Sequence, residues 1–137
     1  MKIFSEKIKY GLAALFELAK NYTKGPIKIE DIATLQNIPQ NYLEHLLIIL
    51  KNADLVKSVR GKNGGYQLKR PANSITVLDL LRGLEGKIST FERYGTSDVL
   101  KYYWKGIEKQ FKELFHTTLE DLINEENKIN NRLFFQI

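Results

Sequence analysis

The chain has 137 residues, a net charge of +5 at pH 7 and no cysteine, so we expect one compact domain without disulfides or a thiolate nucleophile. It has no apolar signal segment and no run of transmembrane length, which predicts a cytoplasmic protein without a membrane partner. Residues 1–70 carry 12 Lys and Arg against 6 Asp and Glu, whereas residues 71–137 carry 9 against 10. This asymmetry is typical of a DNA-binding module followed by an interaction module.

The first predicted helix starts after Ser5, a residue type that can cap a helix, and runs to about residue 21. Its apolar residues recur on one side and predict a buried stripe, made of Ile8, Leu12, Leu15, Phe16 and Ala19. Gly25 and Pro26 end the connection that follows, and residues 27–29 are expected to be extended.

Two further helices are predicted on either side of a break at residues 37–39. Pro39 suits the first position of the second helix, where its missing N–H group is not needed. That helix has a buried stripe of Leu43, Leu46, Leu47 and Leu50. Its first turns carry Asn41, Glu44 and His45 on another face. In a recognition helix, Asn can pair with adenine and Glu can accept from cytosine. A solvated face of a small helical bundle is an equal alternative at this point.

The next segment changes that balance, because it predicts a β-hairpin with a basic tip. Residues 56–59 and 66–69 alternate like short strands, and the sequence between them is Arg-Gly-Lys-Asn-Gly-Gly. The glycines permit positive φ, while Arg60 and Lys62 can reach phosphates or a groove. No P-loop motif is present, and a hairpin with a solvated tip is the alternative. Directly after a helix pair, this order predicts a mainly α fold, a winged helix-turn-helix with a small β-hairpin wing.

A short helix over residues 76–84, ended by Gly86, and an irregular segment over residues 87–97 follow the wing. The next predicted helix covers residues 98–116 and has one strongly apolar side, with the four-three spacing of paired helices. This side could be core of the same chain, but the winged domain already has a core, so we predict a homodimer. The predicted dimer seam consists of Leu100, Tyr103, Trp104, Ile107, Phe111 and Leu114.

A capping-box pattern at residues 117–121 predicts a final short helix. The polar residues 125–128 that follow are expected to be mobile, and the chain ends on an apolar tail. We therefore expect a DNA-binding domain over residues 1–86. A linker, dimerisation helix and tail would occupy residues 87–137, without folding independently.

Several motifs resemble one family of bacterial regulators. They are Tyr42-Leu43-Glu44, residues 53–61, Gly64-Gly65-Tyr66, Thr76-Val77-Leu78-Asp79, Leu84-Glu85-Gly86 and residues 117–122. On these motifs the chain resembles the Rrf2 family of transcription regulators over nearly its whole length. The resemblance implies a homodimer that binds a palindromic site on double-stranded DNA. It is greatest to a cysteine-free branch that represses genes of cysteine metabolism.

The resemblance also implies which residues contact DNA. Base contacts fall on Asn41, Glu44 and Arg60. Backbone or supporting contacts fall on Lys2, Ser5, Lys7, Tyr10, Pro39, Gln40, Tyr42, Lys62, Asn63, Gly64 and Tyr66. Gln40 and Asn41 replace the small residues that are common in this turn, so the preferred DNA sequence is expected to differ from that of familiar relatives.

Many members of that family hold an iron–sulfur cluster, which needs thiolate ligands. Residues 87–97, where the family places those ligands, contain no cysteine, so we expect no cluster and no other cofactor. A zinc site is not supported either, because His45 and His116 are isolated. We also expect no enzyme: Glu85 and Glu92 form no fixed carboxylate pair, and no nucleophile has a matched base.

Without a cluster, the signal must arrive by another route. The resemblance suggests cysteine synthase as a protein partner, an enzyme that captures peptides with a C-terminal isoleucine. We therefore predict docking through the apolar tail of Phe134, Phe135, Gln136 and Ile137. A tail folded onto the dimer helices is the alternative. Two other functions stay open, an adaptor of the same fold that no longer binds DNA and a regulator that senses a small molecule.

Overall fold

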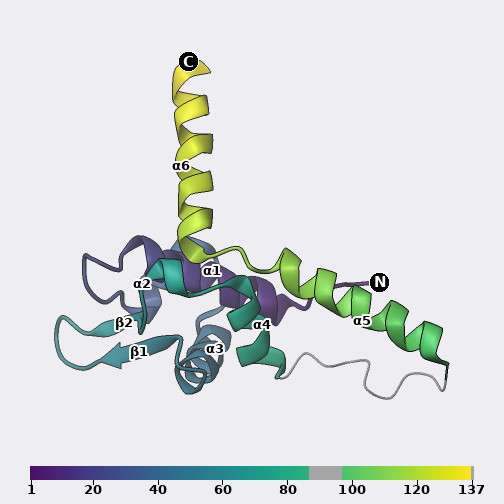
Figure 1. The fold of residues 1–137 in the computed structure, drawn as a ribbon. Helices are drawn as coiled ribbons and strands as arrows, with labels where there is room; N and C mark the ends of the chain where they lie inside the picture. Colours follow the sequence, from purple (N-terminus) through teal and green to yellow (C-terminus); the bar gives the residue numbers. More distant parts are fainter. Residues whose placement is uncertain (87–96, 137) are drawn as a thin grey trace.

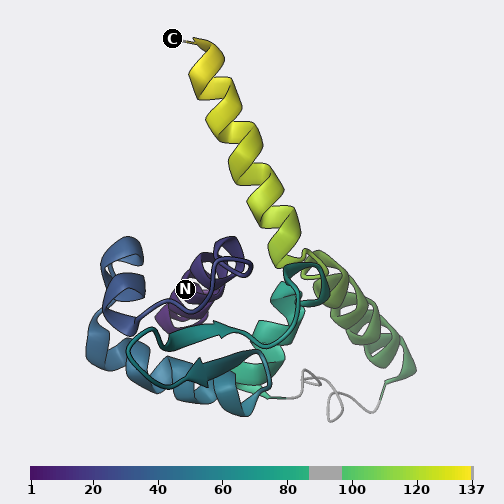
Figure 2. The same cartoon turned by 90° about the vertical axis from the view of Figure 1, so that its left-hand side faces the viewer.

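The computed structural model describes residues 1–86 and 97–136. Helices α1–α4 and a two-stranded antiparallel hairpin lie together in that part of the chain, whereas α5 runs to one side and α6 projects away (Figure 1, Figure 2). The predicted mainly α fold with a hairpin wing is confirmed. The elements are α1 (Glu6–Lys20), α2 (Ile29–Gln36), α3 (Gln40–Asn52), β1 (Val56–Val59), β2 (Gly65–Leu68), the 3₁₀ turn η1 (Ala72–Ser74), α4 (Val77–Glu85), α5 (Asp98–Leu114) and α6 (Leu119–Gln136).

The apolar core lies between the first four helices and the base of the hairpin. Helix α3 contributes its predicted stripe, and each of the four leucines has at most 1% of its surface exposed. Burying one such side chain stabilises the fold by about 1.5–3 kcal/mol. The inner face of α3 is therefore fixed. Other fully buried side chains come from the surrounding elements: Leu15, Leu18, Ile32, Leu55, Leu68 and Leu80.

The junction between α5 and α6 is tied to the segment that leads into α4. The N–H of Val77 donates to the carbonyl of Thr117 at 2.9 Å, and the N–H of Leu119 donates to the carbonyl of Ile75 at 3.0 Å. Leu119 itself is fully buried in the main core. The two outer helices therefore extend from a point that is anchored to the winged domain.

Helices α4 and α6 both begin with a reciprocal capping box. The Thr76 hydroxyl accepts from the Asp79 N–H at 3.1 Å, while the Asp79 carboxylate accepts from the Thr76 N–H at 3.0 Å. Thr118 and Asp121 make the same pair of hydrogen bonds, at 3.0 and 2.9 Å. The predicted capping-box start of the last helix is thus confirmed. Ser5 does lie at the N-cap of α1, but it makes no side-chain capping hydrogen bond.

The expectation of a short final helix followed by a mobile polar segment is wrong, because α6 continues from Leu119 to Gln136. Residues 125–128 lie inside this helix. Lys128 pairs with Glu125 at 3.8 Å along it, and Glu126 lies 3.5 Å from Lys20 Nζ on α1. Part of the support for this polar stretch thus comes from a distant helix, which the local sequence pattern does not reveal.

Helix α5 lies outside the core, and none of its residues is buried. The alternative in which its apolar side forms core of the same chain therefore does not hold. Neither α5 nor any other helix in the described ranges has the length and apolarity that a bilayer-spanning segment requires.

A glycine permits a third strand-like segment to join the wing. Ile27 and the half-buried Tyr66 exchange two backbone hydrogen bonds of 2.8 Å. Next to them, Gly65 has φ +149°, and a Cβ there would clash with the Ile27 carbonyl. Gly61 also has a positive φ, +105°, but open space surrounds the position of its Cβ. Gly61 is thus required by backbone conformation alone, and Gly65 by conformation and close packing.

We expect Gly65→Ala to destabilise the protein by about 1–3 kcal/mol more than Gly61→Ala, because overpacking adds to the backbone strain that both variants share. Urea unfolding of both variants beside the wild type measures this difference. A difference below about 0.5 kcal/mol, the usual range for neutral surface changes, would contradict the close packing of residue 27 against the wing.

Candidate nucleic-acid interface

The turn between α2 and α3 is set by one left-handed residue. Asn37 ends α2 with φ 53° and ψ 51°, a conformation that asparagine tolerates better than most residues. Ile38 is buried, and its N–H donates to the Ala33 carbonyl at 2.9 Å. The sequence predicts Pro39 as the first residue of this helix, but it lies at the N-cap of α3, one position before the first helical residue, Gln40. The predicted break at residues 37–39 is confirmed.

Helix α3 separates a buried face from an exposed face, as its spacing predicts. Asn41, Glu44 and His45 are all exposed in its first turns. Ile48 lies one turn further along, with 55% of its surface exposed. Sequence reasoning missed this residue, because an isoleucine in a leucine-rich helix is usually core. Its i+4 spacing from Glu44 is the pattern that indicates exposure, and an apolar side chain there can meet a thymine methyl group.

The wing presents its cations outward from a tightly folded tip. The two strands pair in antiparallel register, which leaves residues 60–64 as the tip. The N–H of Gly64 donates to the Gly61 carbonyl at 3.0 Å. Gly64 is buried, and a Cβ there would clash with the carbonyl of residue 59. The exposed side chains at the tip are Arg60, Lys62 and Asn63.

Two lysines hold the base of the wing. Lys69 Nζ donates to the Asp54 carboxylate at 2.7 Å, and this hydrogen bond, together with the lysine charge, lowers the pKa of Asp54. Lys51 Nζ donates to the Ser58 hydroxyl at 3.0 Å, which connects α3 to β1. The first contact therefore joins the two ends of the hairpin, and the second joins its first strand to α3.

The predicted backbone contacts on the N-terminal segment differ in their surroundings. Lys2 and Ser5 are exposed. Lys7 Nζ, by contrast, donates to the Leu84 carbonyl at 3.2 Å and lies 3.5 Å from the Glu85 carboxylate. The structure thus places Lys7 at the C-terminal end of α4, where the helix dipole favours a cation.

Tyr10 and Tyr42 join α1 to the start of α3. Their rings meet edge to face, with centroids 5.5 Å apart. The negative charge of Glu6 is the main cause that raises the pKa of Tyr10. Pro39 and Gln40, beside this pair in sequence, are exposed. The structure therefore brings two of the three aromatic members of the predicted set, Tyr10 and Tyr42, together.

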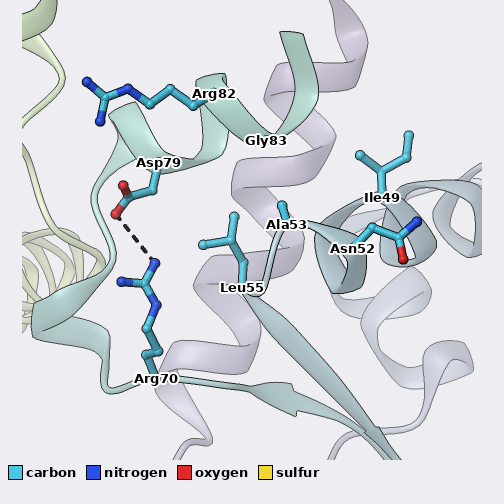
Figure 3. Close-up of a pocket in the computed structure, with 8 residues that line it drawn as sticks. All are labelled: Ile49, Asn52, Ala53, Leu55, Arg70, Asp79, Arg82 and Gly83. Atoms are coloured by element: carbon cyan, nitrogen blue, oxygen red, sulfur yellow. Dashed lines mark ion pairs between the residues drawn. The ribbon is translucent and has the colours of Figure 1, made fainter. Parts of the chain in front are cut away.

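A hollow of about 480 Å³ lies behind the recognition helix, between the end of α3, the base of the wing and α4. Figure 3 shows Arg70, Asp79 and Arg82 along one side, Leu55 near the middle and Asn52 on the other side. An Arg70 guanidinium nitrogen lies 3.7 Å from the Asp79 carboxylate. None of the residues predicted from the sequence to contact DNA, a dimer partner or cysteine synthase lines this hollow. Sequence reasoning missed it because its residues come from three stretches that no periodic pattern relates, residues 49–55, Arg70 and residues 79–83.

The predicted dimer seam is open to solvent or only half-buried. Leu100, Tyr103 and Leu114 are exposed by 50%, 55% and 73%. Trp104, Ile107 and Phe111 are half-buried. An edge-to-face contact of 5.1 Å between ring centroids holds Tyr103 against Trp104. Helix α5 therefore offers a continuous apolar surface.

Three of the four tail residues predicted for partner docking, Phe134, Phe135 and Gln136, belong to the last turn of α6. Phe134 is exposed by 73%. The structure describes only the backbone of Phe135 and Gln136, and Ile137 lies outside the described residues. Residues 87–96, with Glu92 and most of the predicted ligand segment of the family, also lie outside them.

Comparison with known proteins relates this arrangement to one family. The model of the Rrf2 family, described as an iron-dependent transcriptional regulator, matches residues 4–125. The HTH-type transcriptional regulator CymR of Bacillus subtilis (strain 168) is 44% identical over 124 residues, which cover 89% of this chain and 89% of that protein.

Solved structures give the same result. The structure of CymR, described as the global cysteine regulator of B. subtilis, matches with a TM-score of 0.82 and 41% identity over 91% of this chain and 98% of that chain. IscR of T. potens matches with a TM-score of 0.78 and 38% identity, over 92% of this chain and 88% of that chain.

The family description names iron, but the residues of this chain do not fit an iron–sulfur cluster held by thiolates. There is no cysteine at any of its positions, and such clusters are held by thiolates. The described residues include no group of three His, Asp or Glu side chains that could hold a metal ion. His45 and His116 lie on separate elements, with His116 just beyond the end of α5. The family match, the identity with CymR and the shared winged fold together establish that the chain belongs to the Rrf2 family of transcriptional regulators.

Proposed function

We propose that the protein is a homodimeric repressor that binds a palindromic operator through the exposed face of α3 and the wing. One observation carries this proposal: polar Asn41 and Glu44 and the basic wing tip are exposed, while the opposite face of α3 is fully buried. The hairpin lies alongside α3 (Figure 2). A two-fold dimer would set two such units roughly 34 Å apart, one turn of DNA.

The side chains suit separate tasks at that interface. The Asn41 amide can pair with adenine, and the Glu44 carboxylate can accept from the cytosine amino group. The Arg60 guanidinium can form a bidentate contact with a base edge, whereas the Lys62 ammonium, as a point charge, suits a phosphate. We therefore assign sequence readout to the first three residues and backbone binding to Lys62.

Arg60→Ala is expected to cost about 1–3 kcal/mol and to reduce discrimination between operator and unrelated DNA, because it removes a base contact. Lys62→Ala should weaken binding to both DNAs alike and lower the salt slope of the dimer by about 2, because it removes one phosphate contact from each subunit. Both residues are exposed cations at the wing tip, so each variant serves as a control for the loss of one charge in the other. Fluorescence anisotropy with an operator selected from random duplexes measures both effects. Full discrimination in Arg60→Ala would contradict its assignment.

The dimer prediction is tested with Leu100→Ser on the proposed seam and Tyr102→Ser on the other side of α5 as the control. Leu100 would be buried twice in a two-fold dimer, so its loss should weaken association by about 3 kcal/mol or more, over a hundredfold in dissociation constant. Sedimentation equilibrium measures this constant. Both residues are exposed in the single chain, so circular dichroism should stay unchanged. An equal effect of both variants would place the interface on another face.

The regulated genes, in our proposal, belong to cysteine metabolism. Support comes from the 44% identity with CymR and from the description of its structure as a global cysteine regulator. Because the chain has no thiolate to sense iron or redox state directly, we assign the signal to a protein partner, cysteine synthase. The exposed apolar end of α6 around Phe134 is the surface that we propose for it.

Purified cysteine synthase should enhance a mobility shift of the operator by the wild-type protein. Phe134→Ser should lose this enhancement and keep DNA binding by itself, whereas Asn130→Ser, an exposed polar change on the same helix, should keep both. A shift that is indifferent to the synthase would remove the partner from the proposal and leave the regulator in place. No shift with any DNA would favour an adaptor of this fold.

A further inference from the structure

A second basic surface lies beside the wing tip. A hollow of about 450 Å³ opens between the connector that joins α1 to α2 and the tip of the wing. Lys24 and Lys28 line it from the connector, and Lys62 and Asn63 line it from the tip. We refer to it as the connector hollow. Its two lysines on the connector belong to none of the DNA contacts that the family resemblance implies.

The backbone holds these lysines in a defined place. The paired hydrogen bonds between Ile27 and Tyr66 fix the connector against β2, one residue before Lys28. At the other end, the N–H of Lys24 donates to the Asn21 carbonyl at 2.9 Å. The lysine side chains themselves are exposed, so they can adjust to a ligand while their Cα positions stay next to the wing tip.

The charge of the connector hollow is unbalanced. Three lysines line it, and Asp31 is the one carboxylate among the described residues of its lining. No ion pair joins Lys24, Lys28 or Lys62 to a carboxylate in the part of the chain that the structure describes. Like charges gathered in this way repel one another unless an anion compensates them. Lys62 lies at the wing tip. DNA that binds the wing would therefore bring its phosphate groups next to this hollow.

We propose that the connector hollow is a second phosphate-backbone site, in which Lys24 and Lys28 act with Lys62 to hold DNA beside the wing. The inference rests on the proposed function and extends the DNA footprint beyond the α3 face. In this site the lysines contact phosphate as point charges and do not reach base edges. They contribute affinity, and the sequence specificity stays with α3 and Arg60.

The test is the double variant Lys24→Gln/Lys28→Gln, compared with Lys101→Gln/Lys105→Gln. The control removes the same charge from exposed positions on α5, which lies across the molecule from the hairpin (Figure 1). Each lost phosphate contact lowers the slope of log affinity against log salt by about 0.9. A homodimer carries both substitutions in each subunit, so the slope of the connector variant should fall by about 3.6. Its affinity deficit should therefore shrink about a hundredfold between 50 and 200 mM salt. The control slope should stay at the wild-type value.

Two further measurements complete the test. The connector variant should lose affinity for operator and unrelated DNA by the same factor, and Asp31→Asn should bind both more tightly, because it removes the opposing charge from the hollow. A wild-type slope in the connector variant, while wild-type protein binds the operator, would overturn this inference and leave the proposed function standing. Absence of DNA binding by the wild-type protein would overturn both.

Discussion

Burial of the inner face of α3 is the interaction on which the rest of this structure depends. Its four leucines fill the space between α1, α2, α4 and the hairpin base. Truncating one such leucine to alanine typically costs 2–5 kcal/mol, so the helix cannot rotate about its axis without losing the core. That constraint leaves the opposite face in water, and it also determines which side chains can meet DNA. The same packing that stabilises the fold therefore sets the face of α3 that we propose reads DNA.

The lysines of this chain show how surroundings divide one residue type into separate roles. Lys51 and Lys69 bind within the wing base, and Lys7 binds the end of α4. Lys24 and Lys62 project from the surface next to a hollow. Net charge attracts a polyanion in general. In the proposed complex, Lys24 and Lys62, whose side chains make no ion pair or hydrogen bond within the described residues, are the ones that contact the DNA backbone.

The features that depend on local sequence were predictable. The α3 stripe follows from helical periodicity, the turn at Asn37 from the break in that periodicity, and the α6 start from its capping box. The features that depend on distant residues were not. Lys20 on α1 forms an ion pair with the polar part of α6, which the local sequence predicted to be mobile. The third strand-like segment of the wing forms only because residue 27 pairs with residue 66. Pairings of this kind join segments that no periodic pattern relates.

The same division holds for the site. Exposure of Asn41, Glu44 and Arg60 follows from their positions on a helix face and in a hairpin tip. Engagement of Lys7 by α4 does not, because a lysine at a helix start is normally solvated. Ile48 shows the converse case, an apolar residue that the helix geometry turns outward.

The hydrogen-bonded junction between α5 and α6 has a consequence for regulation. The N–H of Val77 donates to the Thr117 carbonyl and the N–H of Leu119 to the Ile75 carbonyl across this junction, so the connection between the outer helices is joined directly to the start of α4. In the proposed dimer, a small rotation of one α5 against its partner would be carried through this joint to both recognition helices. Their separation must match one helical turn of DNA. An effector bound far from the DNA could thus control DNA affinity by changing the separation of the two recognition helices, and with it the spacing of half-sites that the dimer can bind.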